Sequence, residues 1–269
     1  MKISFVVPTK SSERTLDACL TSLRRQDHPD VEVVVVDNHS EDATVGIAAR
    51  LADVVITAGP ERSAQRNIGA AASTGDAVMF VDSDMILEPT VAAAIDAAFT
   101  DPTLGALYVP ELAFGDGFLA QCRALEKRLY LGDPDVEAVR AIRREHFDAV
   151  GGWDEALTAG EDWDLTDRLR AADVRFGRIA AHIWHDEGRV GLRSQFSKKR
   201  YYGKWVADYL DTHGASGRSK LARTSLFRSP ARLLESPRHT AGLAALKVFE
   251  GAGLAAGIRD GRRARAVAA

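Results

Sequence analysis

The chain has 269 residues, of which 46% are hydrophobic and 27% are charged, and its formal net charge is −3 at pH 7. Such a composition is ordinary for a globular protein and excludes a disordered or fibrous chain. The slightly negative charge excludes a polycationic binder of nucleic acid, so no nucleic-acid partner is expected. Cys19 and Cys122 form neither a disulfide framework nor a metal-ligand pattern, and the first residues do not resemble a secretory signal. These features fit a cytoplasmic protein.

Strand-like and helix-like segments alternate through residues 1–110. Short apolar runs rich in β-branched residues predict strands at 3–7, 31–36, 54–57, 77–81 and 104–109. Apolar residues at helical spacing, with suitable first-turn residues, predict helices at 16–23, 40–51, 61–72 and 89–99. The predicted fold class is therefore α/β, a mainly parallel sheet flanked by helices, with right-handed crossovers. In such sheets ligands bind beyond the carboxyl ends of the strands.

The second half of the chain is less regular. It predicts a strand at 136–142, a helix at 161–172, an extended segment at 174–179 and a basic, aromatic helix at 192–210. From about residue 216 the chain is rich in Ala, Arg and Gly, and it predicts a loosely specified helical extension.

The residues that follow the predicted strands indicate a metal site for phosphate. Neither G-x-G-x-x-G nor the G-x-x-x-x-G-K-[ST] signature occurs, so neither common phosphate cradle is expected. Asp82 and Asp84 come directly after a buried strand, and in an extended segment both carboxylates face the same side. A divalent cation would relieve their repulsion and take further ligands from substrate phosphates. The alternative is a strand-ending turn with solvated acids.

Two further sites have open interpretations. Asp37 ends a predicted strand, where its carboxylate could accept from a ribose hydroxyl or a nucleobase, or could simply stabilise a turn beside Asn38 and Ser40. Arg62 and Arg66 lie four residues apart on one predicted helix face. Their guanidinium groups suit phosphate and base edges, although a solvated basic face is the alternative.

A second constellation lies in residues 151–165. Glu161 and Asp162 open a predicted helix after a glycine, where acids also complement the helix dipole. Trp153 and Trp163 flank them, and indole rings stack on carbohydrate. A carboxylate beside such rings can act as a general base.

These motifs, in this order, resemble those of the inverting family 2 glycosyltransferases, which have the GT-A fold. The matching stretches are Phe5–Lys10, Val35–Asn38, Ser63–Gly69, Phe80–Asp84, Gly151–Glu155 and Gly160–Leu165. The resemblance covers about residues 1–190 and implies a nucleotide-sugar half at about 1–110 and an acceptor half at about 111–190. Residues 191–269 would form a basic, aromatic helical extension.

The resemblance implies roles for individual residues in the donor site. Pro8, Thr9 and Asp37 would line the nucleoside pocket. Arg66 would approach the base or the pyrophosphate. Ser83 would join them in binding the nucleotide sugar.

The resemblance also implies a metal and a base. Asp82 would face the ribose and the metal, and Asp84 and His185 would bind Mn²⁺ or Mg²⁺, with His182 as a competitor for the histidine position. Asp162 would be the catalytic base, and Glu161 would support it or touch the acceptor. Trp153 and Trp163 would contact the acceptor, a glycan, a lipid-linked sugar or a small molecule. The donor would be a nucleoside-diphosphate sugar.

The predicted helices after residue 190 raise the question of a membrane. In residues 192–210 the apolar and basic residues fall on opposite sides with some overlap at Lys198 and Lys199, as in an interfacial helix or in one that packs on its own domain. In the apolar segment 241–258, Lys247 and Glu250 would each cost about 2.5–3.5 kcal/mol near a bilayer centre, so it is not expected to span. Arginines 259, 262, 263 and 265 could meet anionic lipid. Peripheral contact with the inner face of the cell membrane is therefore one hypothesis.

Two other functions compete with sugar transfer. A sugar-phosphate nucleotidyltransferase also uses a metal and a nucleotide sugar, but it usually carries a glycine-rich loop that residues 8–14 lack. A non-catalytic nucleotide-sugar-binding or membrane scaffold module would tolerate loss of Asp84 or Asp162, and both are present.

Overall fold

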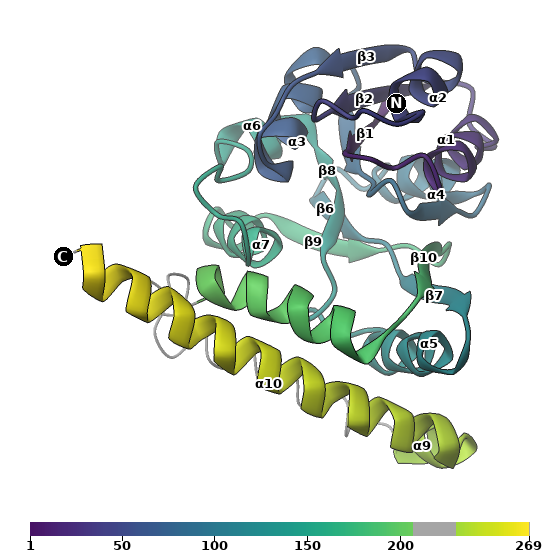
Figure 1. Cartoon of the computed structure of the whole chain (residues 1–269). Coiled ribbons are helices and arrows are strands. Elements are labelled where there is room, and N and C mark those ends of the chain that lie inside the picture. Colours follow the sequence, from purple (N-terminus) through teal and green to yellow (C-terminus); the bar gives the residue numbers. More distant parts are fainter. Residues whose placement is uncertain (207–229, 269) are drawn as a thin grey trace. The chain divides into compact units, whose positions relative to one another are not determined.

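A computed structural model describes residues 1–206 and 230–268 of the chain, with side chains up to residue 264 (Figure 1). The chain divides into two compact units. Unit 1 comprises Met1–Glu111, Glu137–Ala156 and Glu161–Asp186, and unit 2 comprises Leu112–Val136, Leu157–Gly160 and Glu187–Ala269.

Unit 1 is built on a seven-stranded sheet with the strand order β3-β2-β1-β4-β8-β6-β9. The strands are β1 Ile3–Thr9, β2 Val31–Asp37, β3 Val54–Thr57, β4 Ala77–Phe80, β6 Leu104–Tyr108, β8 Val139–Arg143 and β9 Arg175–Arg178. Strands β1 to β4 pair in parallel, as does β6 with β9, whereas β8 is antiparallel to both of its neighbours. The predicted mixed, mainly parallel α/β sheet is therefore confirmed.

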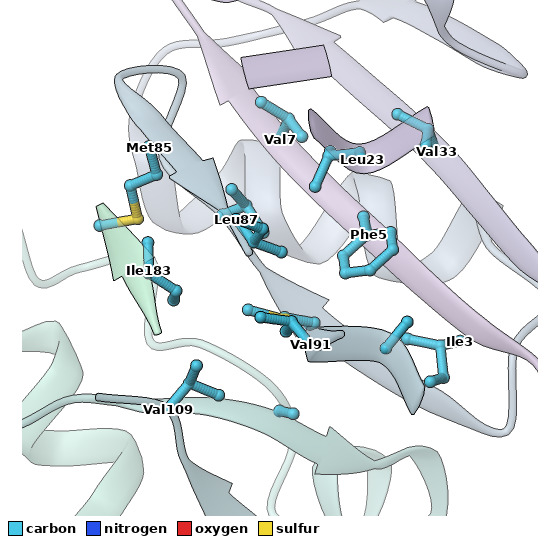
Figure 2. Close-up of a cluster of buried hydrophobic side chains, with 14 of the residues drawn as sticks. Ile3, Phe5, Val7, Leu23, Val33, Met85, Leu87, Val91, Val109 and Ile183 are labelled. Carbon is cyan, nitrogen blue, oxygen red and sulfur yellow. The ribbon is translucent and has the colours of Figure 1, made fainter. Parts of the chain in front are cut away.

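Helices cover both faces of this sheet. One face packs against α1 (Leu16–Arg24), α2 (Thr44–Leu51) and α4 (Val91–Ala98). The other packs against α3 (Arg62–Ala72), α6 (Arg144–Ala149) and α7 (Glu161–Ala171). Successive side chains of a strand point to opposite faces, so Phe5 and Val7 enter the first core while Val6 enters the second. Figure 2 shows part of the first core, including Phe5, Val7 and Val33.

A second sheet holds the strands β5 (Met85–Leu87), β10 (Ile183–Arg189) and β7 (Glu111–Asp116) in the order β5-β10-β7. His185 of β10 lies opposite Met85 of β5, directly after the D-x-D segment. This register brings a histidine one hundred residues later in the chain beside that segment. The strand predicted at 136–142 begins later, at Val139, because residues 133–136 form a turn in which Val136 N–H donates to the Asp133 carbonyl.

Unit 2 contains α5 (Phe118–Tyr130), a helix over residues 192–206, α9 (Pro230–Glu235) and α10 (Pro237–Ala268). The helical extension is thus confirmed in its described part, whereas residues 207–229 of the segment predicted as helix lie outside the described residues. The segment 237–264 of α10 is long and apolar enough to cross a membrane by length and composition alone. Its 18-residue window has a mean hydropathy of 1.4, and a third of that window is buried.

Candidate active site

Every residue predicted to bind donor, metal or acceptor lies in unit 1. Thr9 and Asp37 end the neighbouring strands β1 and β2, and Asp82 follows β4 on the other side of β1. The parallel pairing of these strands therefore places their carboxyl ends at one edge of the sheet, where ligands bind in folds of this kind.

The D-x-D segment is a turn and not the extended segment that the sequence predicted. Met85 N–H donates to the Asp82 carbonyl at 3.0 Å, and β5 begins at Met85. The turn is needed because the chain passes at this point from the seven-stranded sheet into the second sheet. As a result Asp82 and Asp84 have separate partners.

Asp82 is held by two buried arginines. Its Oδ1 accepts from Arg66 Nη2 at 2.9 Å, and its Oδ2 accepts from Arg140 Nη1 at 3.2 Å. Burial alone would raise the pKa of Asp82, but the charges of Arg140 and Arg66 outweigh it and hold the pKa far below the usual range. Asp82 is therefore ionised and fixed in place before any ligand binds.

Arg66 connects the D-x-D segment to the acid pair at the start of α7. Its side chain is 1% exposed, and its Nη1 lies 3.7 Å from Glu161 Oε1 and 3.8 Å from Asp162 Oδ1. The guanidinium carbon also stands 4.4 Å from the centre of the Trp153 ring. Among the described residues, Nε and Nη1 of Arg66 have no hydrogen-bond partner. Since unsatisfied buried donors are costly, these two groups are suited to an anionic ligand.

Asp84 contacts His185. Asp84 Oδ2 lies 3.1 Å from His185 Nε2, and the other ring nitrogen, Nδ1, lies 2.9 Å from Glu111 Oε1. Burial would lower the pKa of His185, but the hydrogen bonds to Asp84 and Glu111 outweigh it and raise the pKa to about 10. Glu111 in turn accepts through Oε2 from Arg140 Nη2 at 3.0 Å. Arg140, Glu111 and His185 thus join Asp82 to Asp84 in one continuous chain of contacts.

The Asp84 and His185 side chains suit a divalent cation. They present a carboxylate and an imidazole at one point, both ordinary ligands of transition-metal ions, and Glu111 fixes the ring as partners of metal-binding histidines do. The described residues contain no group of three or more His, Cys, Asp or Glu that could hold a metal. A cation bound to Asp84 and His185 would therefore depend on phosphate or water for its remaining ligands, as Mg²⁺ often does.

Asp37 is buried within its own turn. Its Oδ1 accepts from Thr9 Oγ1 at 3.0 Å and from Ser40 Oγ at 2.6 Å, and its Oδ2 accepts from the Ser40 amide at 2.8 Å. Gln65 Nε2 donates to the carbonyls of Thr9 and Val36, at 2.9 and 2.7 Å. The ends of β1 and β2 are therefore rigid, and a nucleoside would share the Asp37 carboxylate with these donors.

Glu161 and Asp162 differ in environment. Glu161 is buried and lies 3.3 Å from Arg62 Nη2. Burial and the neighbouring Asp162 charge raise the pKa of Glu161, against the opposing effect of Arg62 and Arg66. Asp162 is 38% exposed, yet its Oδ1 is buried and accepts no hydrogen bond among the described residues. The exposed surface of the Asp162 side chain therefore lies away from Oδ1.

The turn before the acid pair is locked to α3. Asn67 Nδ2 donates to the Trp153 carbonyl at 2.9 Å, and Asn67 Oδ1 accepts from the Trp153 amide at 2.8 Å. Gly152 has φ +70°, and a Cβ there would lie 2.7 Å from Asn67 Oδ1, so a side chain does not fit. Trp153 is 3% exposed and packs edge-on against Phe80, so in this structure it supports Arg66 and shows no open face to a sugar. Trp163 is half-buried.

Four residues of this site were not predicted: Gln65, Asn67, Glu111 and Arg140. A signal existed for two of them. Arg140 lies within the mostly apolar strand predicted at 136–142. Glu111 follows the strand predicted at 104–109, where ligand-edge residues are sought. Gln65 and Asn67 act on backbone groups of other elements, and nothing in a single sequence identifies such partners.

Comparison with known proteins places the chain in a family. The model of glycosyl transferase family 2 matches residues 4–151. The chain belongs to this family. It is 31% identical over 236 residues to the pre-mycofactocin glycosyltransferase of Mycobacterium tuberculosis, an alignment that covers 78% of the chain and 48% of that protein. The chain thus spans about half the length of this relative.

Solved structures of glycosyltransferases share the fold. The mannosyltransferase PcManGT from Pyrobaculum calidifontis, in complex with GDP-Man and Mn²⁺, matches with a TM-score of 0.67 and 17% identity, over 96% of this chain and 87% of that one. Residues 1–349 of TarS from S. aureus, in complex with UDP-GlcNAc, match with a TM-score of 0.57 and 20% identity, over 97% of this chain and 90% of that one. The GT-A fold predicted from the sequence is therefore confirmed.

Proposed function

We propose that the chain is a metal-dependent, inverting glycosyltransferase that moves a sugar from a nucleoside-diphosphate sugar to an acceptor hydroxyl. One observation carries the proposal. The Arg66 guanidinium lies within 4 Å of Asp82, which belongs to the D-x-D segment. It also lies within 4 Å of Glu161 and Asp162, the acid pair at the start of α7. Sugar transfer requires that adjacency, because the acceptor must attack the sugar while it is still attached to the nucleotide.

The donor side of the site would bind the nucleotide. Thr9 and Asp37, with Pro8 and Ser83, would line the nucleoside pocket at the rigid ends of β1 and β2. The unpartnered N–H groups of Arg66 would meet the diphosphate. Asp84 and His185 would hold Mn²⁺ or Mg²⁺, and when bound the metal neutralises charge on the leaving diphosphate as a Lewis acid. Asp82, already paired with Arg66 and Arg140, would contact the ribose and the metal from its fixed position.

The acceptor side would supply the base. Asp162, whose side chain is 38% exposed, would take the proton of the acceptor hydroxyl, a contribution of typically 10²–10⁴-fold in rate. Glu161, whose pKa is raised, would hold a proton more readily and so limit the repulsion between the two acids. In-line attack inverts the anomeric carbon. Trp163 is the better placed of the two tryptophans to touch the acceptor because it is only half-buried.

The proposal extends to the protein's surroundings. We propose residues 1–190 as the catalytic domain and 191–269 as an extension that lets the protein work at the inner face of a membrane. The acceptor would then be a glycan, a lipid-linked sugar or a small molecule.

The experiment is a donor panel with one substitution. Nucleoside diphosphate release is measured with each common nucleotide sugar and Mn²⁺, for the native protein and for Asp162→Asn. The native protein should release product from one donor class, while the variant binds that donor with similar affinity and loses at least 10²-fold in rate. Full activity of the variant would remove Asp162 as the base. Formation of a nucleotide sugar from a sugar phosphate would instead establish a nucleotidyltransferase, and tight binding without turnover would establish a scaffold.

A further inference from the structure

The charged side chains in the middle of α10 pair with side chains of α5. Glu250 is 5% exposed and pairs with Arg123 of α5, while Lys247 lies 2.7 Å from Glu250 and also pairs with Glu126 of α5. Gln195 Oε1 accepts from Arg123 at 3.1 Å. This buried cluster of two basic and two acidic side chains is balanced in charge. The four side chains would lose their partners if α10 left α5, which favours α10 remaining in unit 2 over crossing a bilayer.

A second flank of α10 is occupied by a close helix contact. Gly253, Gly257 and Gly261 lie at four-residue spacing, and a Cβ at each would stand 2.4, 2.1 and 2.7 Å from backbone carbonyls of the helix over residues 192–206. Asp260 pairs there with Arg200 at 2.7 Å. Figure 1 shows the two helices side by side, α10 in yellow and the other in green. Glycines permit such an approach because no side chain separates the backbones.

The remaining face of α10 is apolar for four turns and then basic. At about 100° per residue, one exposed side carries Ala241, Ala244, Ala245, Val248, Ala252 and Ala255, and Arg259, Arg262 and Arg263 continue the same side. Val248 is 69% exposed, and Phe249 at the edge of this face is 42% exposed. We call residues 241, 244, 245, 248, 249, 252, 255, 259, 262 and 263 the outward face.

The outward face contains no acid. Within residues 237–264 the acidic residues are Glu250 and Asp260, and each is paired with an arginine of another helix. The exposed charges of this part of α10 are therefore all basic, in a chain whose net charge is −3. Such an apolar and basic strip complements a surface that is apolar below and anionic above, which describes an anionic phospholipid bilayer. A second copy offers no acid on the same face to pair with these arginines.

We propose that the outward face of α10 docks on the surface of an anionic phospholipid bilayer, with the helix lying along the membrane and its charged cluster still buried in unit 2. The apolar strip would reach the boundary of the acyl chains, and Arg259, Arg262 and Arg263 would contact lipid phosphates. This inference deepens the membrane contact in the proposed function. Vesicle binding is measured without sugar transfer, so either proposal can fail alone.

The test is co-sedimentation of the full chain, without detergent and at low salt, with vesicles of phosphatidylcholine alone or mixed with phosphatidylglycerol. The native chain should bind only the mixed vesicles. Combined substitution of Arg259, Arg262 and Arg263 by Gln should weaken binding roughly 100-fold, at roughly fivefold for each arginine. Substituting the exposed Arg25, Arg50 and Arg175 of unit 1 by Gln gives the same change in net charge and should leave binding within a few-fold. Val248→Asp should also weaken binding, because it places a charge in the apolar strip while the helix content by circular dichroism stays unchanged.

Several results would overturn the proposal. If the native protein does not bind vesicles that contain phosphatidylglycerol, the outward face is not a membrane-docking surface. Equal losses of vesicle binding in the two triple variants would show general charge attraction instead. Protein that stays with membranes after alkaline extraction would have α10 across the bilayer. A dimer in analytical ultracentrifugation that Val248→Asp dissociates, with no vesicle binding, would assign the outward face to a second copy.

Discussion

Replacing Glu111 by glutamine removes one negative charge from the chain of contacts that joins Asp82 to Asp84. Glu111 Oε1 lies 2.9 Å from His185 Nδ1, and its Oε2 accepts from Arg140 at 3.0 Å. Glutamine has nearly the same shape but carries one oxygen and one amide group. It cannot accept from both neighbours, so His185 loses either its orientation or part of its basicity.

The structure sets the size of the effect. Hydrogen bonds to charged groups contribute about 1.5–3 kcal/mol, and outer partners of a metal ligand typically change metal affinity by about 10–100-fold. Glu111→Gln should therefore weaken Mn²⁺ binding roughly 10–100-fold in the presence of a nucleoside diphosphate. The fold should survive, because Arg140 keeps Asp82 as its partner.

The assay needs no turnover. Free Mn²⁺ is measured by electron paramagnetic resonance during a titration, and pulsed measurements detect coupling of the bound Mn²⁺ to an imidazole nitrogen. Glu88→Gln is the matched control, because Glu88, directly after β5, accepts at 2.8 Å from the backbone amide of His182, directly before β10, outside the D-x-D segment. An unchanged dissociation constant and unchanged nitrogen coupling in a folded Glu111→Gln protein would refute the positioning role of Glu111.

Two further predictions follow from pKa values. The pKa of His185 is raised to about 10, so a metal must displace the proton of this ring. Metal affinity should therefore rise up to tenfold per pH unit between about pH 6.5 and 8.5. Calorimetric titrations should show this slope in the native protein and not in His185→Gln. Burial would raise the pKa of Glu32, but hydrogen bonds from Ser4 and Thr74 outweigh it and lower the pKa from 4.5 to about 2. This stabilisation, about 3 kcal/mol at most, is fully present above pH 4.5 and is lost as pH falls through 2. Glu32→Gln should thus lower the urea midpoint at pH 7, and the decrease should become smaller toward pH 3. The control Glu145→Gln, at an exposed residue, should leave the midpoint unchanged at either pH. Equal decreases for Glu32→Gln at pH 7 and pH 3 would contradict the lowered pKa of Glu32.

The sequence predicted the strands of the sheet well because the signal for each strand lies in its own residues. The buried strands β1, β2 and β4 consist mostly of β-branched or apolar residues. The candidate site residues at their ends follow from the rule that ligands bind at the carboxyl ends of parallel strands. Three of the six stretches that carry the resemblance to family 2 glycosyltransferases span these strand ends, namely Phe5–Lys10, Val35–Asn38 and Phe80–Asp84.

What the sequence did not predict depends on contacts between distant residues. The D-x-D segment was expected to be extended, yet it turns because β5 must pair with β10, about one hundred residues later. The partners of Asp82, Arg66 and Arg140, come from two other elements, and no local pattern states that both reach one carboxylate. Trp153 was predicted to meet the acceptor but lies beneath Arg66, since burial of a tryptophan depends on which helix covers it.

The tail shows the same limit. Lys247 and Glu250 were predicted to disfavour membrane spanning, and in the structure both pair with side chains of α5. Because both side chains pair with α5, the exposed side of residues 241–255 is apolar, and that arrangement is visible only once the partners in α5 are known.

The central claim, a nucleotide-sugar site that includes a metal held by Asp84 and His185, is tested most directly by ligand-dependent thermal stability. Melting temperatures are measured with a panel of nucleoside diphosphates and their sugars, with Mn²⁺ and then with EDTA, for the native protein and for Asp84→Asn. A ligand at about 100 times its Kd adds roughly 2.7 kcal/mol of stability, which raises the melting temperature measurably. We predict a shift for one nucleotide base that disappears with EDTA and in Asp84→Asn. A nucleotide shift that is equally large with EDTA and in the variant would contradict the metal site, and no shift with any nucleotide would contradict the donor site itself.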